Sequence, residues 1–353
     1  MRSLFGYILL LFGIFISIPL IVLLLFIPTT PVSPLGIIYL LSYFLIVIGM
    51  ICAPWWSRRS SAFLLMGGTI AFATLVTRTI VPPAGTQMNL MTLPGQAGPR
   101  LLTRLLNEQD VVLFGTQLTP YLGAISSSEK KSLDIKFSQA FHEMKSQGVT
   151  PLSPFLTTYL NQQHPNQFDI VVAEPRSGTP PTTGIVFLHG FGGNFTVQCW
   201  LMAKAGDRID AVTVCPSTEP SGSWWNSQGQ SILQETLTYL QQRGVERIYL
   251  AGLSNGGIGA SQLADPLKQD IVGLILISGA DPNATITGLP VLLLHGKYDE
   301  RIPVSVMEQY ASATGSSATY YLFEGDHFLL LKEADQVQKA MVDWLLQLEL
   351  DSE

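Results

Sequence analysis

The first 107 residues of the chain contain no acidic side chain. No Asp or Glu precedes Glu108 in the 353 residues, whereas six arginines do. Because the whole chain has a net charge of -6, the part from Glu108 onward carries -12. An acidic globular part without a stripe of basic side chains argues against nucleic acid as a partner.

Cysteine is also scarce. The three cysteines, Cys52, Cys199 and Cys215, form neither a disulfide framework nor a zinc-ligand spacing, and we expect no metal or other cofactor. Cys199 and Cys215 could pair in an oxidising compartment if their Cα atoms lie close enough. The sequence does not determine that distance.

Long uncharged runs fill the first 82 residues, and they explain a hydrophobic fraction of 47%. Candidate transmembrane spans are residues 3–27, 35–53 and 62–81, since about 20 apolar residues cross a bilayer core as a helix. The third run is weaker because Arg78 lies near its end. The first is too long for the apolar core of a cleaved signal peptide. We therefore predict two or three transmembrane helices.

Arginines indicate how these spans are oriented. Arg2 and the pair Arg58 and Arg59 mark cytoplasmic ends, and the connector PTTPVSP between the first two spans has no charge. Three spans then place the rest of the chain on the extracytoplasmic side. Two spans would leave it in the cytoplasm, so the orientation depends on residues 62–81.

Three regions follow from composition and periodicity. They are a transmembrane region (residues 1–82), a linker with a helical segment (83–165) and a catalytic domain (166–350). The stretch from Pro82 to Gly98 is rich in proline and glycine, which is typical of a linker. Residues 128–147 have apolar side chains at helical spacing, which predicts an amphipathic helix.

From Phe168 onward, short apolar runs alternate with helical patterns. The runs are FDIVVAE, GIVFLHG, AVTVCP, RIYLAG, VGLILISG, PVLLLHG and TYYLFEG. They lack the strict alternation of half-exposed strands, as strands buried on both faces do. This order predicts a mostly parallel sheet covered by helices, in which ligands bind at the carboxyl ends of the strands.

Ser254 lies in AGLSNGG, between a predicted strand and a predicted helix. This is the G-x-S-x-G pattern of a nucleophilic serine held on a sharp turn. A serine hydroxyl needs a base, and the base needs an orienting carboxylate. His327 and Asp299 follow later strands in the expected order. Asp281 is a rival acid because it too follows a strand, whereas Asp326 adjoins His327 and is poorly placed to reach its ring.

Acyl transfer also needs hydrogen-bond donors for the oxyanion. We expect these to be the backbone N–H groups of Asn255, directly after the serine, and of Phe191 in the HGFGG stretch. His189 and His295 lie where strands meet loops. We expect their rings to form hydrogen bonds with neighbouring backbone.

The motifs HGFGG, GLSNGG, HGKYDERIP and GDHF, over about residues 183–346, resemble those of α/β-hydrolases. Within that superfamily, the chain is similar to the phospholipase/carboxylesterase and dienelactone-hydrolase-like esterases. The resemblance implies the α/β-hydrolase fold, with Ser254 as nucleophile, Asp299 as acid and His327 as base. Trp224 and Trp225 fall where such esterases often carry an aromatic residue beside the pocket, although large aromatics there could equally belong to the core.

The chain also departs from the family. Dienelactone hydrolases use a cysteine where this chain has Ser254, the membrane segment is unusual, and no large helical cap precedes PVLLLHG. The expected function is a membrane-anchored serine hydrolase that acts on a small-molecule or lipid-like carboxylic ester. The alternatives are a peptidase, amidase or thioesterase with the same triad, or a non-catalytic interaction module tethered to the bilayer.

Overall fold

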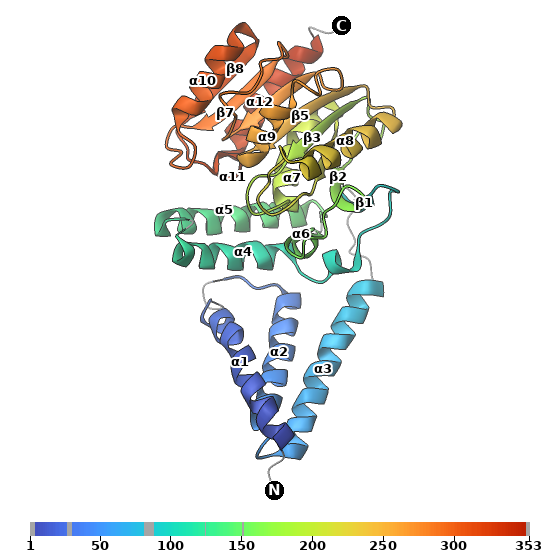
Figure 1. Cartoon of the computed structure of the whole chain (residues 1–353), viewed down its shortest axis with the longest axis vertical. Coiled ribbons are helices and arrows are strands. Elements are labelled where there is room, and N and C mark those ends of the chain that lie inside the picture. Colours follow the sequence, from blue (N-terminus) through green and yellow to red (C-terminus); the bar gives the residue numbers. More distant parts are fainter. Residues whose placement is uncertain (1–3, 27–29, 81–87, 124, 150–151, 351–353) are drawn as a thin grey trace. The chain divides into compact units, whose positions relative to one another are not determined.

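The chain forms two compact units. A computed structural model describes residues 4–26, 30–80, 88–123, 125–149 and 152–350 (Figure 1). Unit 1 comprises Met1–Pro83 and Arg104–Ser138, and unit 2 comprises Ala84–Thr103 and Gln139–Glu353. The chain thus contributes a short first segment to unit 2, returns to unit 1 and then completes unit 2.

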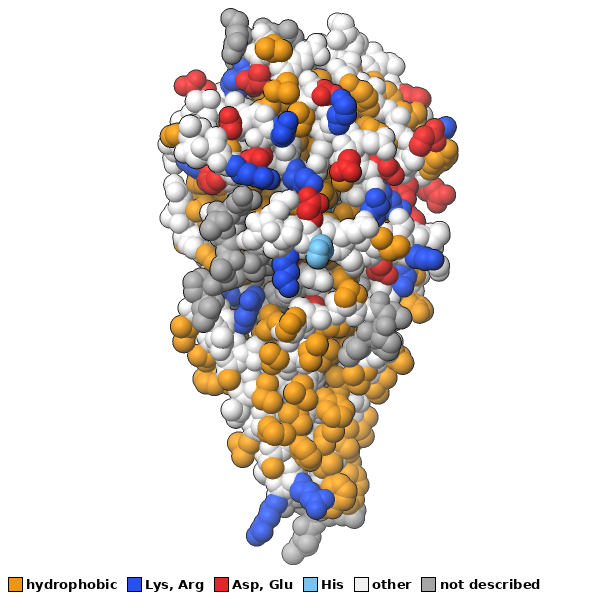
Figure 2. Space-filling model, turned by 180° about the vertical axis from the view of Figure 1, so that it is seen from behind, with side chains coloured by type: hydrophobic (Ala, Val, Ile, Leu, Met, Phe, Trp, Pro, Cys, Tyr) orange, Lys and Arg blue, Asp and Glu red, His pale blue; other side chains and the backbone are white. Residues whose placement is uncertain are grey.

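Unit 1 contains three long apolar helices. They are α1 (Leu4–Phe26), α2 (Pro34–Cys52) and α3 (Ser57–Ile80). All three are long and apolar enough to cross a membrane, and their apolar side chains face outward (Figure 2). The three predicted spans are therefore confirmed as helices, although residues 3, 27 and 81 lie outside the described part. The third helix starts five residues earlier than predicted and includes Arg58 and Arg59.

Close contact between α2 and α3 depends on small residues. A Cβ atom on Gly67 would lie 2.8 Å from the Ser42 carbonyl oxygen. The Ser42 hydroxyl in turn donates to the Gly67 carbonyl at 2.8 Å, and Ser60 donates to Gly49 at 2.7 Å. Small residues of this kind let transmembrane helices approach and hydrogen-bond across their contact.

Unit 1 also contains elements that are not candidate spans. They are α4 (Glu108–Leu118), the 3-10 helix η3 (Thr119–Leu122) and the first part of α5 (Ser127–Ser146). α5 confirms the predicted amphipathic helix, whereas α4 was not predicted. Asn107 caps α4 by accepting a hydrogen bond from the Gln109 N–H.

Unit 2 is built on an eight-stranded sheet with the order β1-β2-β4-β3-β5-β6-β7-β8. β2 pairs antiparallel with β1 and β4, and the other pairs are parallel. The strands are β1 (Met88–Leu93), β2 (Phe168–Ala173), β3 (Thr183–Leu188), β4 (Val212–Pro216), β5 (Arg247–Leu253), β6 (Gly273–Ile277), β7 (Val291–Gly296) and β8 (Ala318–Phe323). The mostly parallel sheet expected from the sequence is confirmed.

Helices cover both faces of this sheet (Figure 1). They are α7 (Thr196–Gly206), α8 (Ser227–Gln242), α9 (Asn255–Leu263), α10 (Val304–Thr314), α11 (Leu329–Lys332) and α12 (Ala334–Leu350), and α6 (Phe155–Tyr159) precedes β2. Val186 and Leu188 join the core cluster that includes residues of α8, α9 and α10. Tyr249 of β5 instead contacts Trp344 of α12. Side chains that alternate between two buried faces explain why the strands read as continuous apolar runs.

β1 lies within the segment expected to be a linker. It pairs with the whole of β2, from Met88 opposite Ala173 to Leu93 opposite Phe168, and Leu93 is buried. The sheet therefore begins at Met88, 78 residues before the expected domain start at residue 166. The proline-rich start of the expected linker, residues 82–85, lies outside the described residues.

Candidate active site

Ser254 occupies a strained turn between β5 and α9. Its φ is +55° and its ψ is -120°, a conformation that a non-glycine residue adopts only when its surroundings enforce it. A Cβ on Gly252 would lie 2.2 Å from the Gly256 carbonyl oxygen, and one on Gly256 would lie 2.0 Å from that of Leu188. Both glycines of G-x-S-x-G are thus required by backbone contacts around the serine.

The three residues predicted for the triad meet at the carboxyl ends of their strands. The His327 Nε2 lies 3.0 Å from the Ser254 Oγ, and its Nδ1 lies 2.8 Å from the Asp299 Oδ2. The Asp299 side chain is fully buried and the His327 side chain is 10% exposed. In this arrangement a histidine can take a proton from the serine while the carboxylate orients its ring.

The Asp299 carboxylate is held in its ionised form. Its Oδ1 accepts hydrogen bonds from the backbone N–H groups of Arg301 and Ile302 at 2.9 and 3.0 Å. Desolvation opposes ionisation, but the hydrogen bonds from His327 and the backbone outweigh it, so the pKa of Asp299 lies below its ordinary value.

The rival carboxylates are engaged elsewhere. Asp281 accepts a hydrogen bond from Gln262 at 2.6 Å and others from its own loop. Asp326 pairs with Lys332 at 2.5 Å and accepts from the Phe328 N–H. Asp299 is the carboxylate that the structure brings to His327.

The loop expected to stabilise the oxyanion packs directly on the serine. A Cβ on Gly190 would lie 3.0 Å from the Ser254 Cβ, so this backbone has no room for a side chain. Among the described residues, the backbone N–H groups of Phe191 and Asn255 have no acceptor. Both N–H groups are therefore available to a ligand, and Asn255 is the first residue of α9, where the helix dipole favours negative charge.

A serine on a strained turn between a strand and a helix of a mostly parallel sheet is characteristic of α/β-hydrolases. Unit 2 has the α/β-hydrolase fold. No protein-family model and no curated relative matches the chain by sequence.

Among solved structures, the chain is similar to Est1E from Butyrivibrio proteoclasticus, with 15% identity and a TM-score of 0.44 over 51% of this chain and 94% of that one. It is also similar to an α/β serine hydrolase homologue from Coxiella burnetii, with 19% identity and a TM-score of 0.41 over 51% of this chain and 92% of that one. A third is α/β hydrolase domain-containing protein 10 from mouse, with 16% identity and a TM-score of 0.40 over 51% and 94%. The strand order and the turn at Ser254 themselves define the fold of unit 2.

Trp224 belongs to the core of the α/β-hydrolase fold, which corrects its proposed place beside the pocket. Its side chain is 0% exposed, and its Nε1 donates to the His189 carbonyl at 2.9 Å. A Cβ on Gly259 would lie 2.5 Å from the Trp224 Cβ. Trp224 therefore braces the strand end that leads into the oxyanion loop. Trp225 is 39% exposed, and a pocket role for it stays a prediction.

His189 and His295 both form hydrogen bonds with backbone, as expected. The His189 Nε2 accepts from the Thr218 N–H at 3.2 Å and its Nδ1 faces the Gly190 carbonyl at 2.8 Å, which fixes a neutral ring. Burial lowers the pKa of His189 to about 4. The His295 Nε2 lies 3.1 Å from the Ile302 carbonyl, and burial lowers the pKa of this ring too. His295 thus stabilises the turn that contains Asp299.

The sequence did not reveal what supports the far side of the oxyanion loop. The Thr196 hydroxyl donates to the Leu152 carbonyl at 2.6 Å, and the rings of Phe155 and Phe195 stack 6.2 Å apart. A Cβ on Gly193 would lie 3.2 Å from Thr158. The segment around α6 thus packs against the oxyanion loop. No local motif could have predicted these contacts.

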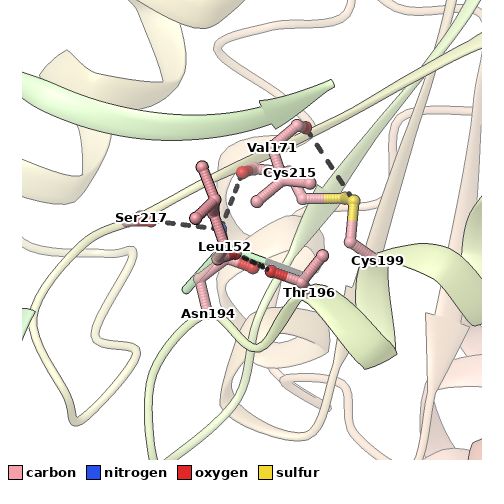
Figure 3. The surroundings of a disulfide bond; sticks show 7 residues. All are labelled: Leu152, Val171, Asn194, Thr196, Cys199, Cys215 and Ser217. Carbon is pink, nitrogen blue, oxygen red and sulfur yellow. Dashed lines mark hydrogen bonds between the residues drawn. A yellow bond between two sulfur atoms is a disulfide. The ribbon is translucent and has the colours of Figure 1, made fainter. Parts of the chain in front are cut away.

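Cys199 and Cys215 form a disulfide that joins α7 to β4 (Figure 3). Their Cα atoms lie 6.0 Å apart, which settles the pairing that the sequence left open. Beside it, the Asn194 side chain donates to the Cys215 carbonyl at 2.7 Å and to the Ser217 hydroxyl at 3.1 Å. The disulfide therefore lies beside Asn194, the residue that follows the HGFGG stretch.

Proposed function

We propose that the protein is a membrane-anchored serine hydrolase that cleaves carboxylic esters through an acyl-enzyme. The observation that carries this proposal is the position of His327, within hydrogen-bonding distance of both Ser254 and Asp299. The free N–H groups of Phe191 and Asn255 beside the serine support it.

In the proposed reaction, the Ser254 Oγ attacks the ester carbonyl while its proton passes to the His327 Nε2. The C–O bond to the alcohol then breaks, and His327 returns the proton to the departing oxygen. A water molecule next attacks the acyl-enzyme, gives its proton to His327 and releases the acid, and Ser254 regains its proton. Asp299 orients the ring and stabilises its charged form throughout. Phe191 and Asn255 donate to the oxyanion in both halves.

Carboxylic esters are the proposed substrates, and an open site is consistent with them. Residues 278–290 connect β6 to β7 without a helix, so no helical cap is inserted there. Thioesters and amides react with the same triad. A non-catalytic module is the alternative of a different class, and the ordered triad argues against it.

The test is labelling of the purified full chain with a fluorophosphonate together with turnover of p-nitrophenyl esters, thioesters and aminoacyl amides. Both labelling and turnover should disappear in Ser254→Ala. The matched control is Ser305→Ala, an exposed serine of α10 that should change neither. Labelling that survives in Ser254→Ala would overturn the assignment, and a folded protein that never labels would favour the non-catalytic alternative.

We propose further that unit 2 faces the extracytoplasmic side. Three candidate spans, Arg58 and Arg59 at the start of α3, and the disulfide between Cys199 and Cys215 support this orientation. Alkaline phosphatase fused to the C-terminus of the full chain should be active. Gly68→Arg should abolish that activity because an arginine near mid-span costs about 2.5–3.5 kcal/mol on insertion scales. Apart from the neighbouring backbone of α3, no atom lies within 4 Å of a Cβ at Gly68, so the first atom of the new side chain meets no clash. An inactive fusion of the unmutated chain would contradict the orientation.

A further inference from the structure

Unit 1 holds a segment that contacts the ends of the first two candidate spans. This interfacial segment comprises α4 and η3, Glu108–Leu122. Asp110 accepts hydrogen bonds from Ser33, the N-cap of α2, through the backbone N–H at 2.8 Å and the hydroxyl at 2.5 Å. At the other end of the segment, the Tyr121 ring lies 6.0 Å from that of Phe26, the last residue of α1.

The chain leading into the segment is tied to the third helix. The Arg104 guanidinium donates to the Thr79 carbonyl at 2.9 Å, and Arg78 donates to the Arg104 carbonyl at 2.7 Å. These contacts involve the C-terminal ends of α1 and α3 and the N-terminal end of α2. In helices that cross a membrane in alternating directions, those three ends lie on the same side.

The segment has one covered side and one apolar end that is not covered. Thr116 and Gln117 are buried, and both donate to the Asp134 carboxylate of α5 at 2.8 Å. Tyr121 and Leu122 are both 78% exposed, beside the end of a candidate span. In the described part of unit 1, both side chains thus remain largely open to solvent.

We propose that the interfacial segment lies in the membrane–water interface and inserts Tyr121 and Leu122 among the lipid headgroups. The Phe26–Tyr121 contact makes this surface continuous with the lipid-facing surface of α1. Tyrosine is enriched at this depth because its ring is apolar and its hydroxyl remains hydrated. The double hydrogen bond from Ser33 to Asp110 holds the segment at the level where α2 begins. The inference rests on the proposed membrane anchor.

Depth-dependent fluorescence quenching tests the proposal in the full chain reconstituted into phosphatidylcholine–phosphatidylglycerol vesicles. In a Cys52→Ala background, Leu122→Cys provides a single reactive thiol for an NBD label, because Cys199 and Cys215 are paired. Tyr121→Cys provides a second reporter. Leu41→Cys, half-exposed near the middle of α2, reports on the span, and Gln234→Cys, exposed on α8, reports on water.

We expect headgroup nitroxides to quench the labels at 121 and 122 several-fold more than nitroxides placed deep in the acyl chains. The label at 41 should show the reverse preference, and the label at 234 should resist both. Labels at 121 and 122 that behave like the one at 234, while 41 is quenched from the bilayer centre, would overturn the interfacial position alone. A label at 41 that is not quenched would overturn the membrane anchor and this inference with it.

Discussion

The helices of the two units carry apolar side chains of the same types, but those of unit 1 are mostly exposed and those of unit 2 are mostly buried. Of the 23 residues of α1, only Gly6, Gly13 and Leu20 are buried, and most of its other large side chains are exposed. In α8 the buried residues include Ile232, Leu233 and Leu237, and the exposed ones are mostly polar. Unit 2 therefore completes a core of its own, whereas the three long helices of unit 1 leave apolar side chains exposed, as helices that cross a membrane do. We therefore expect substitutions at closely packed positions of unit 2 to lower stability or activity, and substitutions over much of unit 1 to have little effect.

The largest loss is expected at the carboxylate of unit 2. Asp299→Asn should lower kcat by about 10⁴, because an amide no longer fixes the His327 tautomer or stabilises its charge. The matched change in unit 1, Asp110→Asn, also alters a carboxylate with two hydrogen bonds but should leave kcat unchanged. Steady-state hydrolysis of a p-nitrophenyl ester checks both variants. An equal loss of kcat in the two variants would contradict the assignment of catalysis to unit 2.

Next in size is the effect of Gly256→Ala. Helix propensity alone would make alanine more stable by about 1 kcal/mol at this position in α9. The new Cβ would instead meet the Leu188 carbonyl at 2.0 Å, so we expect a loss of about 3 kcal/mol together with loss of activity. Urea unfolding in detergent gives the sign directly. A more stable, active Gly256→Ala would show that the turn at Ser254 can relax.

Acid should destabilise unit 2 through His189. Because the folded-state pKa is lowered to about 4, the unfolded chain binds a proton first as the pH falls below about 6.5. Stability is therefore complete above pH 6.5 and is lost progressively down to pH 4, by on the order of 3 kcal/mol. Urea midpoints between pH 7.5 and 4.5 measure this slope. His189→Gln should reduce this slope, with the remainder coming from His295, and His142→Gln, exposed on α5, should leave it unchanged.

The smallest effects are expected at neighbouring glycines of unit 1. Gly67→Ala should cost about 1–2 kcal/mol because its Cβ would approach the Ser42 carbonyl to 2.8 Å. Gly68→Ala, with no atom within 4 Å, should change stability by less than about 0.5 kcal/mol. Thermal unfolding in detergent compares the two. An equal cost at both positions would mean that the contact between α2 and α3 is looser than described.

Features that repeat along the chain were predictable. The alternation of strands and helices, the candidate spans and the positions of Ser254, Asp299 and His327 follow from periodicity and from residues at strand ends. Contacts between distant segments were not. Trp224 looked suited to a pocket, and only its hydrogen bond to His189 and the absence of a side chain at Gly259 assign it to the core.

β1 and the disulfide show the same limit. The sequence MNLMTL follows a proline-rich stretch and has little β-branched character, so its pairing with β2, about 80 residues later, overrides its local pattern. Cys199 and Cys215 are 16 residues apart in sequence, and nothing local determines that α7 lies against β4 at that point.

The oxyanion loop has a consequence for how this site would respond to random mutation. The proposed donor at position 191 is a backbone N–H, while the Phe191 side chain is 78% exposed. Nineteen of the twenty amino acids supply that N–H, and only proline removes it. A saturation scan would therefore show position 191 as permissive apart from a single intolerant substitution. An average over all substitutions at position 191 would hide the role of its backbone N–H group. The intolerance of proline alone would reveal that role.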